Sequence, residues 1–498
     1  MNSANIDNTV VRPKGLVKAR LSRDDIIMRG GMIVIALYLV ISLVFPLYSM
    51  FSKSFSTFQY DLSKFEVQVS DDAGQFSPEI TSLQNLNEGL KAIPDEELST
   101  GSGGRLGATI FFPDFSFRSP VMYRIRNVDG QGRFLVGSTL MTGTDWQELD
   151  SNTFRRVQLR PVRSTGLSNF INYFSTPALF KSIQNSIFIA IISTIITVIL
   201  AFWFAYALNR SCMRFKGFFR LIAMAPILVP SLLPGIALVY LFGAQGVIKG
   251  LLFGASIYGP IGIIIGSVFF TFPHAFLIIS TALAISDARL YEAAISLKAS
   301  PWKTFWTVTI PGARYGIISA AFVVFNLVIT DFGLPKVIGG QFNVLAVDIY
   351  KQVIGQQNFE MGAVVSVVLI IPAILAFAID RVVQSKQVAL LTARSVPFNP
   401  KPSSRADLIF TIYCGLVGLF IIGMLGICQF AALIKFWPYD LSLSLNNYQF
   451  DKMDGGGWGA YYNSIKMAFL TALIGTCCLL YTSPSPRDLS TSRMPSSA

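Results

Sequence analysis

The sequence has only one histidine and five cysteines in 498 residues. All five cysteines lie in or beside apolar stretches, at Cys212, Cys414, Cys428, Cys477 and Cys478. Their spacing fits neither a disulfide framework nor a metal site. The histidine, His274, stands inside an apolar run. We interpret it as a packed or pathway-lining residue and not as a ligand, and we expect no cofactor.

Charged residues are scarce too, at 14% of the chain, whereas 52% of the residues are hydrophobic and the mean hydropathy is +0.54. A soluble protein of this length does not need so much apolar surface. Apolar runs that approach about 20 residues are typical of membrane helices. We predict six such helices in the first 380 residues, at 30–51, 183–208, 221–242, 261–285, 315–338 and 362–379.

The net charge of +12 follows the predicted topology. Basic residues are frequent in the N-terminal tail (1–29), in the loop after residue 208 and in the linker 381–407. The opposite loops, 243–260 and 339–361, carry few charges. Because basic loops stay on the cytoplasmic side, we predict a cytoplasmic N-terminus. The topology explains the positive charge, so no nucleic-acid partner is expected.

The polar segment 52–182 follows the first predicted helix and would lie on the outer side. It contains short β-like runs at 108–112, 121–126, 133–137 and 154–162, joined by segments rich in Gly, Ser, Asp and Asn. Its first part, 71–104, is expected to be partly helical or loose. We predict a small β-rich domain on the outer face. Two interpretations are open: docking of a partner protein, or a structural insertion.

The polar loop 286–314, called the Glu292 loop below, separates two apolar runs. Asp287 is a predicted N-cap for a short helix over 288–298, in which Leu290, Ala293, Ala294 and Leu297 share one small apolar face. Ser300 and Pro301 predict the start of a second helix. Pro311 is expected to end that helix near Ile310.

This loop carries a family resemblance. Glu292-Ala293-Ala294, followed after a gap by Val308-Thr309-Ile310-Pro311, resembles the EAA loop of permease subunits in binding-protein-dependent ABC importers. The chain departs from that pattern at Lys298, where the family usually has glycine. The resemblance implies a coupling helix that docks on an ATPase subunit dimer. It implies contact through Glu292, Ala293, Ala294, Leu297, Lys298, Ile310 and Pro311. The alternative is an ordinary amphipathic cytoplasmic loop.

The resemblance implies a fold and a location. The fold would be an all-α polytopic membrane protein, with the first permease core at 183–380 and the periplasmic insertion before it. The location would be the bacterial inner membrane. The sequence lacks the phosphate-binding pattern G-x-x-x-x-G-K-[ST], so ATP hydrolysis is expected in a separate subunit and the chain itself is not an enzyme.

Three residues are candidates for the pathway. Pro230 and Pro234 stand in one predicted membrane helix, which indicates either an irregular, gate-forming helix or a simple kink. Asp331 is an ionisable residue near membrane depth, where it would line a pathway, cap a helix end or pair with Lys336.

A second block, 408–481, begins after the linker, with a predicted seventh helix at 408–434. Asn463-Ser464-Ile465 begins an eighth and matches Asn185-Ser186-Ile187 in register. This repeat predicts two permease modules in one chain, the second truncated. The tail 482–498 has low-complexity composition and is interpreted as non-native sequence.

Fused double permeases resemble the ferric-iron permeases. Within that group, residues 329–394 are most similar to 2-aminoethylphosphonate permeases, on strings such as Ile329-Thr330-Asp331-Phe332-Gly333. The resemblance implies a periplasmic substrate-binding protein, membrane lipid and, for a truncated module, a second permease half as partners. Ferric iron, polyamine or another small solute is the alternative substrate. A secondary transporter is disfavoured because the membrane runs carry almost no charge.

Overall fold

The computed structural model describes residues 23–59, 65–70, 75–82, 108–110, 123–127, 134–136, 139–141, 145–149, 157–159, 162–388, 400, 402–450 and 456–482. Most of the predicted N-terminal tail and all but the first residue of the predicted tail 482–498 lie outside these ranges. The chain divides into two compact units. The first unit comprises Met1–Ser49, Leu433–Lys435 and Ser442–Ala498, and the second comprises Met50–Ala432 and Phe436–Leu441.

Long apolar helices dominate the described chain and confirm the predicted helical, polytopic fold. Six are long and apolar enough to cross a membrane: Arg29–Ser54, Pro177–Arg210, Pro260–Ile285, Pro301–Ile329, Phe359–Val383 and Ser404–Leu433. The first is built from α1 (Arg23–Leu39), the π-helical turn η1 (Val40–Val44) and α2 (Phe45–Ser54). The predicted eighth helix is present as α16 (Gly457–Thr482), although it is not among these six.

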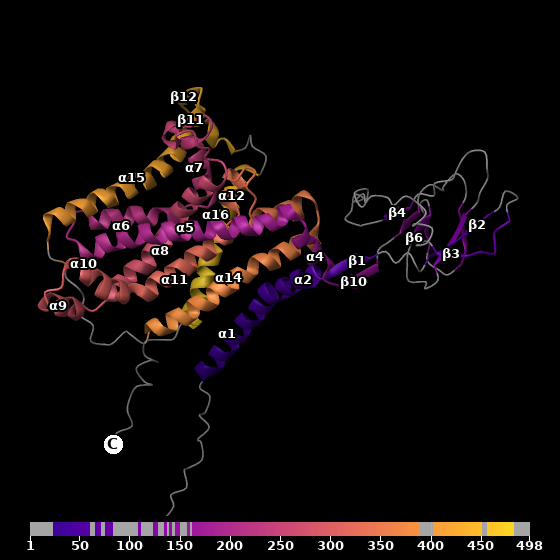
Figure 1. Ribbon diagram of the computed structural model, residues 1–498, viewed down its shortest axis with the longest axis horizontal. Helices are drawn as coiled ribbons and strands as arrows, with labels where there is room; N and C mark the ends of the chain where they lie inside the picture. Colours follow the sequence, from indigo (N-terminus) through magenta and orange to yellow (C-terminus); the bar gives the residue numbers. More distant parts are fainter. Residues whose placement is uncertain are drawn as a thin grey trace, which may run out of the picture. The chain divides into compact units, whose positions relative to one another are not determined.

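The second unit contains the predicted permease core (Figure 1). Its helices are α4 (Ser168–Ser175), α5 (Pro177–Arg210), α6 (Lys216–Met224), η4 (Ala225–Leu228), α7 (Leu232–Phe242), η5 (Lys249–Leu252), α8 (Pro260–Ile285), α9 (Ala288–Ser296), α10 (Pro301–Thr304), η6 (Phe305–Thr309), α11 (Ile310–Ile329), α12 (Gly333–Ile338), α13 (Leu345–Tyr350), η7 (Lys351–Gly355), α14 (Phe359–Val388) and α15 (Ser404–Leu433).

The centre of this unit is formed by α5, α8 and α11, which pack against one another in pairs. Small residues allow the close approach of α8 and α11, because a Cβ on Gly316 would overlap the methyl group of Ala282. Between α5 and α8, the hydroxyl groups of Thr197 and Thr271 share a buried hydrogen bond of 3.2 Å. A polar contact of this kind satisfies both hydroxyl groups inside an apolar bundle.

The predicted helix at 221–242 is broken. The segments Lys216–Leu228 and Leu232–Phe242 are bent by 107° relative to each other. Proline lacks the N–H that would continue the helix, so Pro226 and Pro230 account for the break. The helix is therefore irregular and not simply kinked, and its predicted role in forming a gate stays a prediction.

The ends of α5 and α8 show which way the chain runs across the break. Arg210, the last residue of α5, donates from Nη2 to the carbonyl oxygen of Leu283, near the end of α8, over 2.9 Å. The two helices therefore finish at the same end of the bundle. The chain must cross back before α8 begins, and the bent pair α6–α7 is the segment that does so.

The fifth predicted helix also differs from the structure. The single run expected at 315–338 is divided into α11, which ends at Ile329, and the short α12. The second predicted helix, 183–208, is longer than expected and begins at Pro177. Proline favours the first turn of a helix, where its missing N–H has no partner to lose.

The described residues of the polar insertion form ten short strands: β1 (Ser56–Gln59), β2 (Phe65–Val69), β3 (Thr81–Ser82), β4 (Ala108–Ile110), β5 (Tyr123–Asn127), β6 (Phe134–Val136), β7 (Thr139–Met141), β8 (Gln147–Leu149), β9 (Val157–Leu159) and β10 (Val162–Thr165). The four predicted runs correspond to β4, β5, β6 and β9. Most of 71–104 lies outside the described residues.

These strands form two antiparallel four-stranded sheets, in the orders β3-β2-β5-β8 and β4-β9-β6-β7, and the pair β1-β10. In the first sheet Val67 faces Ile125, and both side chains are fully buried. The pair β1-β10 brings the two ends of the insertion together, with Ser56 opposite Thr165. The insertion therefore enters and leaves the helical part at one place.

The predicted linker 381–407 is shorter in the structure, because α14 continues to Val388 and α15 begins at Ser404. Most of α15, up to Ala432, belongs to the same compact unit as the first core. Three hydrogen bonds connect them: Cys212 N–H donates to Asp407 Oδ1 over 2.8 Å, Tyr413 Oη donates to the carbonyl oxygen of Leu200 over 2.8 Å, and Cys428 Sγ donates to that of Leu233 over 3.9 Å. Most of α15 thus packs with the first core, and the start of a second permease module at residue 408 stays a prediction.

Candidate functional site

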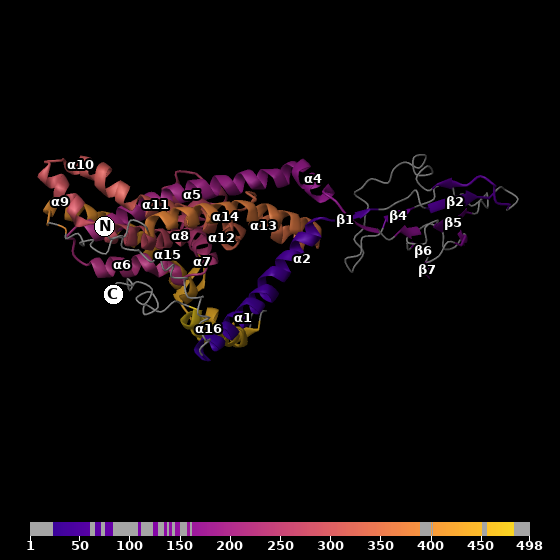
Figure 2. The same ribbon diagram turned by 90° about the horizontal axis from the view of Figure 1, so that it is seen from below.

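The Glu292 loop begins with α9, whose N-terminus is capped as predicted. The Asp287 carboxylate accepts a hydrogen bond from the Arg289 backbone N–H over 3.1 Å. This bond satisfies one of the backbone donors that the first helical turn leaves without a partner. Figures 1 and 2 both show α9 and α10 at the end of the bundle opposite α4.

The two sides of α9 have different environments. Ala288, Tyr291 and Ala294 are buried against the protein. Glu292 and Ala293 are exposed, and the side chains of Leu290 and Leu297 are 56% and 82% exposed. We predicted that Ala294 shares one face with Leu290, Ala293 and Leu297. This is wrong for Ala294, because tertiary packing buries it together with Ala288 and Tyr291 on the inward side of α9.

The end of α9 explains how lysine replaces glycine in the resembled pattern. Lys298 has a φ of +54°, in the left-handed region that glycine adopts most easily. Its N–H donates to the Ile295 carbonyl oxygen over 2.9 Å, and the next N–H, of Ala299, donates to that of Ala294 over 3.0 Å. These two bonds form a Schellman motif. The left-handed turn that glycine makes in the family pattern is therefore present here, and the Lys298 side chain raises its conformational free energy.

Arg210 and Tyr291 anchor the loop to the bundle. Besides the Leu283 carbonyl oxygen, Arg210 Nη2 donates to Ser286 Oγ, and the guanidinium carbon lies 4.8 Å from the centre of the Tyr291 ring. Tyr291 Oη donates in turn to Thr309 Oγ1 over 3.1 Å, and this contact is buried. The start of α9 is thus connected to α5, α8 and η6 by one chain of contacts.

The second part of the loop differs from its prediction. Ser300 caps α10 as expected, since its Oγ accepts from the Lys303 N–H over 3.2 Å. The helix does not end near Ile310. Instead η6 leads into α11, and Pro311 stands in the first turn of α11. One continuous helix runs from Pro301 to Ile329, and the π-helical turn η6 directly before Pro311 accommodates the residue that lacks an N–H.

Phe305 is the centre of an aromatic cluster between the loop and α5. Its ring stacks on Trp203, with centroids 5.5 Å apart and planes 2° apart. It also contacts four further rings, at centroid distances of 5.5 to 5.9 Å: Phe202, Tyr206, Trp302 and Trp306. Phe305 is only 8% exposed. The cluster reaches α15, because Tyr206 contacts Phe410 at 5.7 Å.

The candidate pathway residues meet at the break between η4 and α7. Pro234 is buried and Pro230 is exposed. Asp331 accepts a hydrogen bond from Ser231, which stands at the break, and another from the Gly333 N–H over 3.2 Å. The structure therefore brings Asp331 to the break, where it caps α12. The geometry does not favour the predicted alternative, a pair with Lys336. The Lys336 ammonium group instead contacts the Tyr350 ring, 4.3 Å from its centre.

Asp331 is a hydrogen-bond acceptor at this break. Ser231 and three backbone N–H groups donate to its carboxyl group. Close packing surrounds the site, because a Cβ on Gly235 would lie 3.1 Å from Val337 Cβ. The group acts as an acceptor that holds α7 and α12 together.

Sequence reasoning missed the residues that anchor the loop. In the sequence, nothing distinguishes Arg210 from the other basic residues of its loop, or Phe305 from the other 40 of the 41 phenylalanines. A signal for Phe305 is present in retrospect: Trp302, Phe305 and Trp306 recur at helical spacing beside Phe202, Trp203 and Tyr206. Ser231 gives no signal, because its role depends on the break.

Comparison with known proteins bears on this geometry. Residues 211–388 match the family described as binding-protein-dependent transport system inner membrane component. The matched part runs from the end of α5 to the end of α14 and contains the whole Glu292 loop. It supports the resemblance to an ABC importer permease and a multi-pass inner-membrane location.

The curated relatives are permeases of several transport systems. The chain is 25% identical over 313 residues to the ferric transport system permease protein FbpB of Actinobacillus pleuropneumoniae, an alignment that covers 59% of this chain and 45% of that protein. It thus spans less than half of that relative. It is 29% identical over 180 residues to the molybdenum transport system permease protein ModB of Azotobacter vinelandii, covering 34% of this chain and 80% of that one.

Among solved structures, the chain is similar to a bacterial ABC transporter involved in the import of the acidic polysaccharide alginate. The identity is 16%, the TM-score is 0.37, and the match covers 46% of this chain and 85% of the other.

Proposed function

We propose that the chain is a transmembrane permease subunit of an ATP-driven importer, and that the Glu292 loop is its contact with the ATPase subunits. The observation that carries the proposal is the outward side of α9, where Leu290 and Leu297 are exposed on a loop anchored by Arg210 and Phe305. Exposed leucines on a firmly held helix suit docking into a groove.

The proposed orientation places this loop in the cytoplasm. Arg210 contacts Ser286 and Tyr291, so the basic segment that follows α5 lies at the same end of the bundle as the loop. That segment also carries Arg214, Lys216 and Arg220. Basic loops remain on the cytoplasmic side, where an ATPase partner would be found.

On the opposite side, the β-rich insertion and the outer loops would receive a periplasmic substrate-binding protein. The second block, with α15 and α16, would begin a second permease half, in this chain or with a partner. In the transport cycle, ATP binding and hydrolysis in the partner would move the Glu292 loop, and the bundle would alternate between outward and inward access.

The substrate that we propose is 2-aminoethylphosphonate, on the similarity of residues 329–394 to permeases for that compound. Ferric iron is the second candidate, because the A. pleuropneumoniae relative is a ferric transport permease. A polyamine is a third, because the chain is 25% identical over 225 residues to the spermidine/putrescine transport system permease protein PotB of Haemophilus influenzae.

The docking proposal is tested by charge substitution on α9. Leu297→Asp should prevent co-purification of the ATPase subunit, because a carboxylate cannot enter an apolar groove without a partner. Leu251→Asp is the matched control, since Leu251 is also exposed, at 61%, but belongs to η5 in the opposite loop. Equal ATPase recovery with both variants and the unmodified chain would contradict the assignment of this loop.

The substrate is tested separately by uptake of labelled 2-aminoethylphosphonate, ferric iron and spermidine in cells that express the permease with its ATPase and binding protein. Uptake of the phosphonate alone supports the first candidate. Uptake of iron or spermidine without phosphonate replaces it and leaves the importer assignment intact.

A further inference from the structure

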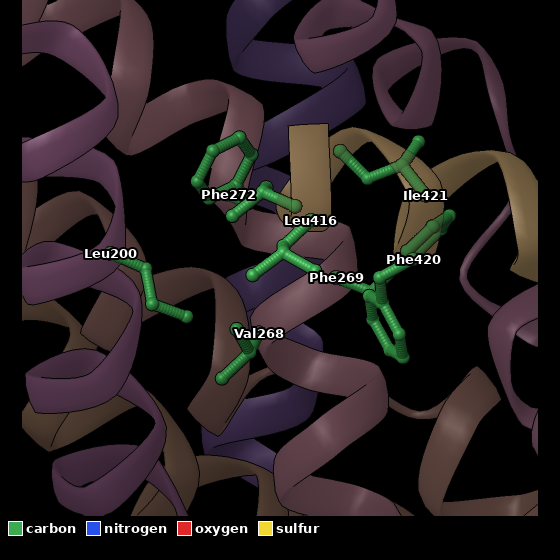
Figure 3. Close-up of a pocket in the computed structure, with 8 residues that line it drawn as sticks. Leu200, Val268, Phe269, Phe272, Leu416, Phe420 and Ile421 are labelled. Carbon is green, nitrogen blue, oxygen red and sulfur yellow. The ribbon is translucent and has the colours of Figure 1, made fainter. Parts of the chain in front are cut away.

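A groove of about 250 Å³ lies between α15 and the α5–α8 face of the bundle (Figure 3). Leu200 of α5 and Val268 and Phe272 of α8 form one side, and Leu416 and Phe420 of α15 form the other. Figure 3 shows these side chains pointing toward a common space. All the residues that line it are aliphatic or aromatic.

The lining determines what can occupy the groove. A water molecule needs two or more polar partners, so an apolar space of this kind remains dry. The groove is larger than an apolar cavity of about 150 Å³, which is already enough to bind benzene. It therefore offers a site to an apolar molecule.

The groove has a buried floor and an exposed rim. Its floor includes Phe269 and Ile421, each 2% exposed, whereas Leu416 and Phe420 at its rim are 63% and 39% exposed. Both α8 and α15 are long and apolar enough to cross a membrane, which would place the groove at the depth of the acyl chains.

Size distinguishes between two kinds of occupant. A transmembrane helix with its side chains is about 10–12 Å wide and buries a long face, which far exceeds this space. A single unbranched hydrocarbon chain is narrow and flexible enough to enter. Because membrane hydrocarbon is as apolar as this lining, the fit of the chain to the space, and not transfer from water, would hold it there.

We propose that this groove binds one acyl chain of a membrane phospholipid, which fills the space between α15 and the first permease core. Polar contacts secure α15 toward its N-terminus, through Asp407 and Tyr413, and the groove follows directly along the helix. The lipid chain would complete the packing of α15 where protein side chains leave a gap. This proposal does not depend on what the protein transports.

The direct test is photolabelling of the unmodified chain in membranes that contain a phospholipid with a diazirine in one acyl chain, followed by peptide mass spectrometry. We expect adducts concentrated at Val268, Leu416 and Phe420. Adducts spread evenly over all the lipid-facing helices would show ordinary surface lipid and overturn the proposal. Loss of these adducts on assembly with a second permease half would show that a protein side chain is the occupant and would also overturn it.

A pair of tryptophan variants gives an independent readout. Val268→Trp would fill the groove, and Leu419→Trp adds the same side chain to an outward position of α15 that is 68% exposed. After mild delipidation, native mass spectrometry of Val268→Trp should show at least a fivefold loss of bound phospholipid. Leu419→Trp should match the unmodified chain. Equal retention in both variants would refute the site.

Discussion

Replacing Phe305 with alanine should detach the Glu292 loop from α5 while leaving the rest of the bundle folded. Phe305 is 8% exposed and contacts five aromatic rings. Truncation of a buried phenylalanine to alanine costs about 3–5 kcal/mol, and an aromatic pair adds about 0.5–1.5 kcal/mol beyond its buried area. We take the lower limit, about 3 kcal/mol, because the cluster lies at the end of the bundle and can partly collapse.

The assay is hydrogen exchange of the purified protein, followed at the amides of α9 and η6. A loss of about 3 kcal/mol corresponds to roughly 100-fold faster exchange where opening breaks the cluster. The amides of α8 should be unaffected. In the assembled importer, the same variant should reduce the stimulation of ATPase activity by the loaded binding protein.

The matched control is Trp306→Ala. Trp306 lies one residue further along η6 and is 53% exposed, so its removal should change exchange less than tenfold. Phe305→Leu retains the apolar volume and should recover most of the protection. If Phe305→Ala changes exchange less than threefold, or if Trp306→Ala has an equal effect, the central role of Phe305 is refuted.

Three further substitutions test other contacts. Lys298→Gly should raise the stability of α9 by about 1 kcal/mol, because glycine adopts a φ of +54° without strain on a side chain. Hydrogen exchange of the last amides of α9 measures this effect, and unchanged exchange would contradict it. Ala294→Trp should reduce transport at normal expression, because the buried site forces α9 outward, and full uptake would count against a coupling role. Asp331→Asn keeps an acceptor for Ser231 and Gly333, so transport should persist, whereas abolished transport with normal folding would show that a charge is required.

The helical fold and the position of the Glu292 loop could be predicted because they depend on local chemistry. Long apolar runs specify membrane helices, and Asp287 and Ser300 specify two caps that the structure contains. The inward turn of Ala294 could not be predicted, because the apolar stripe on α9 is wide enough to pack in more than one rotation. Its orientation is decided by Tyr291, which must reach both Arg210 and Thr309.

Prolines show a second limit of local reasoning. Pro311 was expected to end a helix, but the helix Pro301–Ile329 continues through it after the π-helical turn η6, whereas Pro230 contributes to a break of 107°. The residue type is the same, and the surrounding structure decides whether the helix accommodates the missing N–H or breaks. The role of Asp331 depends in turn on that break, because Ser231 reaches it only where α7 begins anew.

The aromatic cluster around Phe305 also gives the protein an optical probe of its own. Three of the six tryptophans in the chain, Trp203, Trp302 and Trp306, belong to this cluster. Trp302 and Trp306 are more than half exposed, and Trp203 is 37% exposed. Their emission would shift in colour whenever the surroundings of the loop change polarity. Bulk tryptophan fluorescence of the unlabelled protein is therefore weighted toward the Glu292 loop, and an arriving partner could be followed in real time without attaching a dye.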